Sequence, residues 1–245
     1  MYTIFEIAPE DNFEDEMIKL REQELDGFNV TVPYKEKIIE YLDDIDPYAK
    51  KIGAVNTVKC KDGKWIGYNT DGIGYVRSLE SKYPEIQTVK DCTILMLGAG
   101  GAAKGICHAL VDKGYTSITI ANRTKEKAQL LTEQHPSNQA ISLEDAAQRV
   151  NEFDIIIQTT SIGMKPNTEE MIIPFTSLKQ GAIVSDIVYQ PIVTKFLQHA
   201  KEMNASIHLG HTMLLYQALY AFEIWTNLEP NMKHLDDELQ HVLEG

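Results

Sequence analysis

Cysteine, positive charge and long apolar runs are all scarce in this sequence. Its three cysteines, Cys60, Cys92 and Cys107, are odd in number and lack metal-ligand spacing, which indicates core residues in a reducing compartment. No apolar run approaches the ~20 residues of a transmembrane helix, and the N-terminus lacks the pattern of a signal peptide. A formal net charge of −13 argues against a nucleic-acid-binding surface. We therefore expect a cytoplasmic protein with neither a nucleic acid nor a membrane as partner.

Short apolar runs alternate with segments of helical periodicity along the chain, and we find no internal repeat. The patterns predict strands at residues 2–8, 28–32, 54–59, 64–69, 92–97, 118–121, 155–158 and 182–186. They predict helices at residues 9–24, 35–42, 71–83, 101–113, 211–227 and 231–243. Asp62-Gly63 supplies a hairpin turn between two of the strands. This alternation is typical of an α/β fold with two parallel-type sheets.

A glycine-rich stretch, Gly98-Ala99-Gly100-Gly101-Ala102-Ala103, joins an apolar strand to a helix. The spacing G-x-G-x-x-A is a variant of the dinucleotide-binding fingerprint, in which the absence of side chains lets a pyrophosphate approach the backbone N–H groups. A tight packing turn without a ligand is the alternative interpretation. With a fingerprint in this context, we expect a Rossmann-type, doubly wound domain over residues 85–210. Residues 1–84 with 211–245 would form a second α/β domain that binds the substrate in the cleft between the two.

The end of the next strand indicates which dinucleotide binds. Asn122-Arg123-Thr124 follows that strand about twenty residues after the glycines, where an NAD site usually has a carboxylate. A guanidinium with Lys125 and Lys127 nearby suits a 2′-phosphate instead. This favours NADP over NAD, although a plain strand end followed by a helix that Thr124 caps is compatible with the same residues.

Four polar residues of the first third stand out among small or β-branched neighbours. Thr31 and Lys35 follow the strand at residues 28–32, Asn56 lies in Gly53-Ala54-Val55-Asn56-Thr57, and Asp71 lies at a helix start. Each has an ordinary alternative: Asp71 as an N-cap, Lys35 as a solvated helix residue, and Asn56 as a turn residue. Their spacing does not establish that they meet.

Ordered motifs that span residues 27–217 resemble those of the shikimate dehydrogenase family. Residues 29–35 resemble its N-V-T-x-P-x-K signature, residues 186–194 resemble D-x-x-Y-x-P-x-x-T, and residues 210–217 resemble G-x-x-M-L-x-x-Q. Further matches lie at residues 53–57, 67–72, 98–102, 122–124 and 159–164.

The resemblance implies NADPH-dependent, reversible reduction of 3-dehydroshikimate to shikimate, a step of aromatic amino-acid and chorismate biosynthesis. It implies Lys35 and Asp71 as the catalytic pair. Residues implied to bind the substrate are Thr31, Asn56, Tyr189 and Gln217. Residues implied to bind NADP are Gly98, Ala99, Gly100, Gly101, Ala102, Asn122, Arg123, Thr124, Lys127, Gly210 and Met213. No metal site is expected.

The sequence departs from the family at its start. Members usually open with a strand and a helix that carry a Ser-x-Ser pair for the substrate carboxylate, whereas the first serine here is Ser78 and no Ser-x-Ser occurs. About two dozen residues of the family pattern would then be missing, which would expose a sheet edge. We expect this chain to bind NADPH with weak or no dehydrogenase activity. The alternative functions are those of a quinate-type dehydrogenase and of a non-catalytic NADP-binding fragment. We expect the protein to be a monomer or a homodimer.

Overall fold

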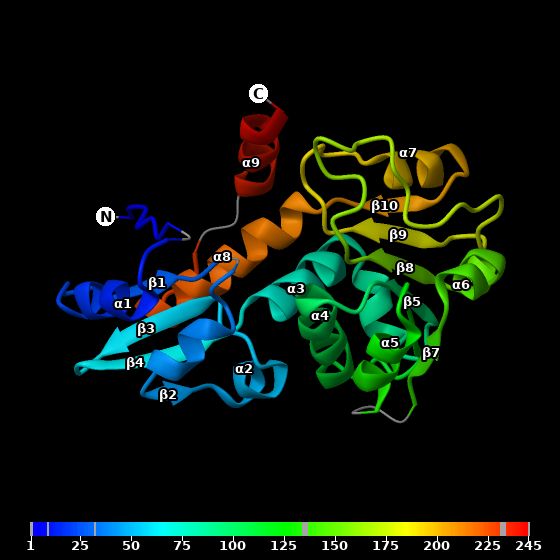
Figure 1. Ribbon diagram of the computed structural model, residues 1–245. Helices are drawn as coiled ribbons and strands as arrows, with labels where there is room; N and C mark the ends of the chain where they lie inside the picture. The colour runs from blue at the N-terminus through cyan, green and yellow to red at the C-terminus, as the bar shows by residue number, and fades with distance from the viewer. Residues whose placement is uncertain (1, 9, 32, 134–136, 231–233, 245) are drawn as a thin grey trace. The chain divides into compact units, whose positions relative to one another are not determined.

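The computed structural model describes residues 2–8, 10–31, 33–133, 137–230 and 234–244 (Figure 1). By internal contacts the chain divides into a smaller unit, residues 1–68, and a larger unit, residues 69–245. This division falls earlier than the predicted domain boundary at residues 84 and 85, and it groups residues 69–84 and 211–245 with the nucleotide-binding region. The predicted domain limits stay a prediction.

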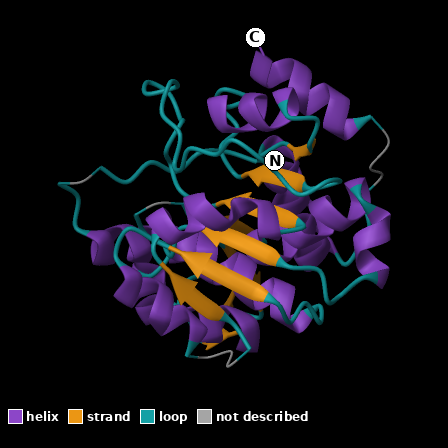
Figure 2. Cartoon of the chain, turned by 90° about the vertical axis from the view of Figure 1, so that its right-hand side faces the viewer, coloured by secondary structure: helices purple, strands orange, loops and turns teal. Residues whose placement is uncertain are grey.

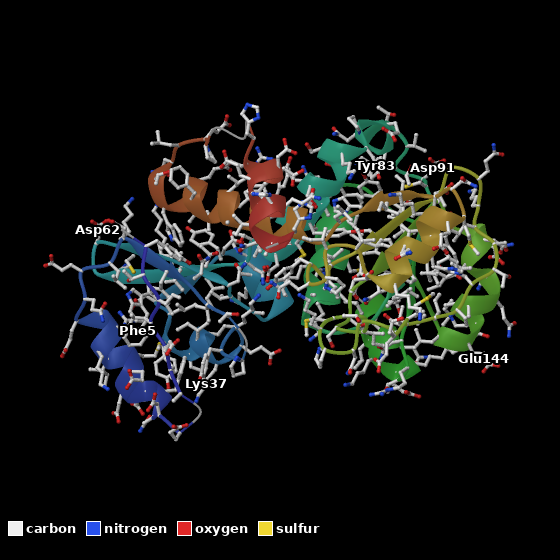
Figure 3. All side chains as sticks on the ribbon, turned by 90° about the horizontal axis from the view of Figure 1, so that it is seen from above. Phe5, Lys37, Asp62, Tyr83, Asp91 and Glu144 are labelled. Atoms are coloured by element: carbon white, nitrogen blue, oxygen red, sulfur yellow. The ribbon has the colours of Figure 1, made fainter. Side chains whose placement is uncertain are left out.

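The smaller unit contains a four-stranded mixed sheet of order β1-β3-β4-β2. Its strands are β1 (Gly27–Asn29), β2 (Asp44–Ile45), β3 (Thr57–Lys61) and β4 (Lys64–Tyr68). β3 and β4 form the predicted hairpin, and Asp62 and Gly63 take positive φ values of 52° and 73° at its tip (Figure 3). A two-residue loop joins only antiparallel neighbours. The prediction of two parallel-type sheets was therefore wrong for this one, in which only β2 and β4 run parallel.

Apolar side chains from three short helical elements cover this sheet. These elements are α1 (Phe13–Arg21), the 3₁₀ helix η1 (Lys37–Tyr41) and α2 (Pro47–Ile52). α1 is shorter than the predicted helix because the side chain of Asn12 caps it, accepting from the Glu14 N–H. The core of the unit lies between α1, η1 and the sheet, with Phe13, Met17, Leu20, Ile38, Val58 and Trp65 among its buried side chains.

The N-terminal segment, residues 2–8, is extended but forms no strand, so that prediction was wrong. It is held by side-chain contacts, in which the Tyr2 hydroxyl donates to Asn29 and the Tyr34 hydroxyl donates to the carbonyl of Ile7. A groove of about 860 Å³ is lined by this segment, α1 and residues of β1, with Phe5 beside α1 (Figure 3). The alternating apolar residues suit a strand, but strand formation also needs a hydrogen-bonded neighbour.

The larger unit is built on a six-stranded, fully parallel sheet of order β10-β9-β8-β5-β6-β7 (Figure 2). Its strands are β5 (Ile94–Leu97), β6 (Ile118–Ala121), β7 (Gln139–Ile141), β8 (Ile155–Gln158), β9 (Ile183–Asp186) and β10 (Ser206–His208). Helices cover both of its faces (Figure 2), which explains why β5, β6, β8 and β9 are buried along their whole length. The Rossmann-type, doubly wound α/β prediction is confirmed.

The helices of this unit come in two groups. Connections between strands contain α4 (Gly101–Asp112), α5 (Lys125–Thr132), α6 (Leu143–Arg149), η3 (Val150–Glu152) and α7 (Lys195–Glu202). Before and after the sheet come α3 (Asp71–Lys82), η2 (Pro84–Thr88), α8 (His211–Thr226) and α9 (Leu235–Glu244). α3 packs against both α4 and α8. The chain leaves β5 toward β6 on one side and returns to β8 on the other, so the carboxyl ends of β5 and β8 form the topological switch point, where such sheets bind ligands.

Candidate active site

Three predicted site residues of the smaller unit come together at the end of β1. The Val30 N–H donates to the carbonyl of Asn56 at 2.8 Å, and the Val55 N–H donates to the carbonyl of Lys35 at 2.8 Å. These two backbone bonds hold Val30, next to Thr31, and Lys35 beside residues 55 and 56. The Asn56 side chain is 3% exposed, whereas Lys35 is half-buried and Thr31 is exposed. The geometry therefore unites Thr31, Lys35 and Asn56, which spacing alone does not.

Asp71 is the first residue of α3 in the larger unit, and the N-cap position belongs to Thr70. The side-chain oxygen of Asn69 accepts from the Asp71 N–H at 3.1 Å. The alternative interpretation of Asp71 as an N-cap was therefore wrong, because Asn69 supplies the side-chain acceptor at this helix start.

Gly74 brings α3 into close contact with α8. A Cβ added to Gly74 would lie 2.7 Å from the backbone nitrogen of Gln217, a distance that real Cβ atoms do not tolerate. Gly74 follows Asp71 by three residues, just under one helical turn. The structure therefore places Asp71 and the half-buried Gln217 at neighbouring levels of two packed helices.

Asp186 closes the loop that carries Tyr189. This fully buried carboxylate accepts from the Thr194 hydroxyl at 2.7 Å, the Val188 N–H at 2.9 Å and the Gln158 side-chain amide at 3.2 Å. Burial raises the pKa of Asp186 to about 7, against the opposing effect of the three donors. Because the loop begins at Asp186 and ends at Thr194, both ends are held together, and Tyr189 between them is 39% exposed.

The first turn of α8 lies directly against this loop. A Cβ added to Gly210 would lie 2.6 Å from the carbonyl carbon of Ile187, so only glycine fits there. Gly210 precedes the helix, and Met213 lies in its first turn. The contact brings two of the residues implied to bind NADP, Gly210 and Met213, to the loop that carries Tyr189.

The glycine-rich turn lies at the carboxyl end of β5, at the switch point of the sheet. Gly98 has a φ of +115°, and a Cβ there would lie 2.5 Å from Oγ1 of Thr159. A Cβ on Gly100 or on Gly101 would meet no atom within 4 Å, and Gly100 has an ordinary φ of −87°. Gly100 and Gly101, at the start of α4, therefore border open space where a side chain would stand, which fits a dinucleotide pyrophosphate.

Asn122, Arg123 and Thr124 follow β6, next to that turn across the parallel sheet. The Asn122 side-chain amide donates to the carbonyl of Thr124 at 2.9 Å, while Arg123 and Lys127 are exposed. Thr124 occupies the N-cap position of α5, but within the described part of the chain its side chain accepts no capping bond. The guanidinium is thus presented at the carboxyl edge of the sheet without an ion pair to an acidic side chain in the described residues.

The described residues contain neither a membrane-spanning helix nor a cluster of metal-binding side chains. No helix there is long and apolar enough to cross a membrane. In the same residues, no cluster of three or more His, Cys, Asp or Glu side chains could hold a metal ion. The fold and the site together define an α/β protein of the dinucleotide-binding class, with polar groups around the topological switch point of its six-stranded sheet.

Three family models match the chain: shikimate dehydrogenase substrate binding domain at residues 1–58, shikimate/quinate 5-dehydrogenase at 80–202, and shikimate 5′-dehydrogenase C-terminal domain at 210–234. The shikimate dehydrogenase (NADP(+)) of Oceanobacillus iheyensis is 52% identical over 100% of this chain and 88% of its own. The chain belongs to the shikimate dehydrogenase family.

Solved structures agree with this assignment. A shikimate dehydrogenase in complex with NADP⁺ has a TM-score of 0.85 at 39% identity, over 98% of this chain and 84% of its own. The shikimate 5-dehydrogenase of Thermus thermophilus in complex with NADP(H) and shikimate has a TM-score of 0.81 at 29% identity, over 97% and 85% of the two chains.

Proposed function

We propose that the chain catalyses the reversible reduction of 3-dehydroshikimate to shikimate with NADPH, and that Lys35 and Asp71 are its catalytic pair. The proposed reaction rests on the similarity to the relative from Oceanobacillus iheyensis, which matches the whole chain. The proposed residue roles rest on the family motifs. We further propose a cytoplasmic enzyme, monomeric or homodimeric, with small molecules as its partners.

The glycine turn and the Arg123 cluster fit the cofactor. Open space beside Gly100 and Gly101 suits the pyrophosphate, and the exposed guanidinium of Arg123 suits the 2′-phosphate. We assign Ala99, Ala102, Asn122, Thr124, Lys127, Gly210 and Met213 to the same cofactor. When bound, NADPH supplies the hydride that attacks the ketone carbon.

The two proposed catalytic side chains have complementary tasks. As the carbonyl oxygen of the ketone gains negative charge, the Lys35 ammonium donates a proton from Nζ and stabilises the developing alkoxide. The Asp71 carboxylate orients that ammonium through opposite charge. Thr31, Asn56, Tyr189 and Gln217 would hold the ring hydroxyls, because hydroxyl, amide and phenol groups both donate and accept hydrogen bonds.

Replacement of Lys35 tests this assignment. Lys35→Ala should lower kcat by about 100-fold or more, the usual contribution of a positioned acid or base. The matched control is Lys37→Ala in η1, an exposed lysine of the same unit whose ammonium lies over the Phe13 ring. Asp71→Asn should also lower kcat strongly. Retention of most of the turnover by Lys35→Ala at saturating substrate would remove Lys35 from the mechanism.

Two further measurements decide between this proposal and its alternatives. Turnover of shikimate and of quinate, compared side by side, identifies the preferred ring acid. Calorimetric NADPH binding without turnover of either would indicate a non-catalytic NADP-binding protein. Weak or absent dehydrogenase activity stays a prediction that the same kinetics address.

A further inference from the structure

A chain of buried hydrogen bonds crosses the larger unit, centred on His208 at the end of β10. The Tyr75 hydroxyl of α3 donates to Oγ of Ser185 in β9 at 2.7 Å, and that oxygen lies 2.8 Å from Nδ1 of His208. On the other side of the ring, Nε2 lies 3.1 Å from Oγ of Ser78 and 3.0 Å from Oγ1 of Thr212. Tyr75, Ser185 and His208 are all 0% exposed. Four elements, α3, β9, β10 and α8, are thereby joined through one imidazole.

The hydroxyl groups on the Nε2 side fix the proton on that nitrogen. Ser78 donates to the carbonyl of Tyr75 at 2.7 Å, and Thr212 donates to the carbonyl of Leu209 at 2.7 Å. A hydroxyl has a single proton, so both groups can only accept from His208. Nε2 must therefore carry a hydrogen that is shared between Ser78 and Thr212.

The Nδ1 side then has only one consistent arrangement. Burial lowers the pKa of His208 to about 3, with Lys82 and His211 adding to the effect, so the ring is neutral and Nδ1 is an acceptor. Ser185 donates its hydroxyl proton to Nδ1 and accepts from Tyr75. Burial also raises the pKa of Tyr75, which keeps its phenol protonated as this requires. Every hydrogen bond in this network thus has one donor-to-acceptor direction, from Tyr75 through Ser185 and His208 to Ser78 and Thr212.

Each end of this chain lies next to residues of the candidate site. Tyr75 follows Asp71 by four residues on α3, about one turn of the same helix face. Thr212 lies in the first turn of α8, between Gly210 and Met213. The hydrogen bonds therefore tie α3 to both β9 and β10, and the first turn of α8 to β10.

We propose that His208, as its neutral Nε2–H tautomer, is a positioning residue that sets the start of α3 and the first turn of α8 for cofactor binding and turnover. The role of these segments rests on the function proposed above, but the proton arrangement does not. A phenylalanine or leucine at position 208 could fill the volume, yet it would leave the buried Ser78, Ser185 and Thr212 hydroxyls without their shared partner.

Nitrogen-15 NMR of the full chain with labelled histidine tests the tautomer directly. At pH 7 we expect His208 to show a protonated Nε2 and an unprotonated Nδ1. A proton on Nδ1, or a charged imidazole, would overturn the proposal whether or not the chain has dehydrogenase activity.

Two buried tyrosines offer a matched comparison for the positioning role. Tyr75 and Tyr115 are both 0% exposed, and the Tyr115 hydroxyl donates to Glu80 at 3.0 Å, away from the candidate site. Tyr75→Phe should lower kcat or weaken NADPH binding by about tenfold, as expected for misplaced reacting groups. Tyr115→Phe should leave both constants unchanged, although it lowers the melting temperature comparably.

The conservative variant at the central position completes the test. His208→Gln retains an amide donor that can reach Ser78 or Thr212, so it should keep more NADPH affinity than His208→Leu. Equal kinetic and binding constants for Tyr75→Phe and Tyr115→Phe would show that the hydrogen-bond network around His208 contributes to stability alone. This result would overturn the positioning role. Absence of NADPH binding in the parent chain would contradict the proposed function, while the NMR result would still decide the tautomer.

Discussion

Arg123 is the residue on which we propose that the preference for NADP depends. It is exposed at the end of β6, where an NAD site would present a carboxylate to the ribose 2′-hydroxyl. Arg123→Gln removes the positive charge and the paired N–H donors, so the KM for NADPH should rise by about tenfold or more, corresponding to one lost charge-assisted contact. The KM for NADH, which lacks the 2′-phosphate, should change little.

The control for this variant is Lys113→Gln, an exposed cation just after α4 at the opposite end of that helix from the glycine turn. It should leave both constants unchanged. A parent enzyme that prefers NADH, or an Arg123→Gln variant with an unaltered KM ratio, would contradict the 2′-phosphate assignment.

The strand–turn–helix formed by β5, the glycine turn and α4 gives a prediction for a whole structural element. Gly98 and Gly100 lie two residues apart but face different constraints. Gly98→Ala would force a side chain into a left-handed φ and against Thr159, so the protein should lose about 1–3 kcal/mol of stability. Gly100→Ala should leave stability nearly unchanged, because its Cβ would enter open space.

Gly100→Ala, which should leave stability nearly unchanged, should instead lower the affinity for NADPH. The Cβ of Gly100→Ala would occupy the space that we assign to the pyrophosphate, so we expect a loss of about tenfold or more in NADPH affinity at an unchanged melting temperature. Thermal unfolding and calorimetric titration measure the two effects. Unaltered NADPH binding by Gly100→Ala would show that the turn serves only packing.

The accuracy of the sequence predictions differs between elements for a physical reason. β6 and β8 were predicted at their observed limits, because strands buried on both faces require continuous apolar runs. β7 and β10, with three residues each, were missed, since so short a segment shows no periodicity. The predicted helix at residues 35–42 is the 3₁₀ helix η1, and the predicted strand at residues 2–8 has no strand partner.

For the molecule as a whole, two buried titratable groups act on stability in opposite directions. The pKa of His208 falls from 6.5 to about 3, so its contribution to stability is lost as the pH falls below 6.5. The pKa of Asp186 rises from 3.8 to about 7, so the folded state gains stability as the pH falls through 7 toward 4. Between these limits one group opposes the other, and their effects largely cancel.

Single substitutions should expose each effect. Relative to the parent, Asp186→Asn should lose about 2 kcal/mol of unfolding free energy between pH 7.5 and 5, and His208→Gln should gain about 2 kcal/mol. Urea unfolding at several pH values measures both changes, and Asp145→Asn, an exposed capping carboxylate, is the control. If the unfolding free energies of the parent and of either variant change with pH in parallel, the proposed titration of the buried group at that position is contradicted.

The order of residues along the chain was enough to establish the parallel core strands, the glycine turn and the Asn122-Arg123-Thr124 cluster, because burial and local backbone conformation are encoded by neighbouring residues. Three-dimensional packing was needed to establish which remote segments meet: the backbones of Val30 and Lys35 with residues 55 and 56, Gly74 of α3 with Gln217 of α8, Asp186 with Thr194, and His208 with its hydroxyl partners. It also established that the smaller sheet is mixed and that residues 2–8 form no strand. Hydrogen bonds and strand pairs join segments far apart in the chain, and their register depends on how the whole unit packs.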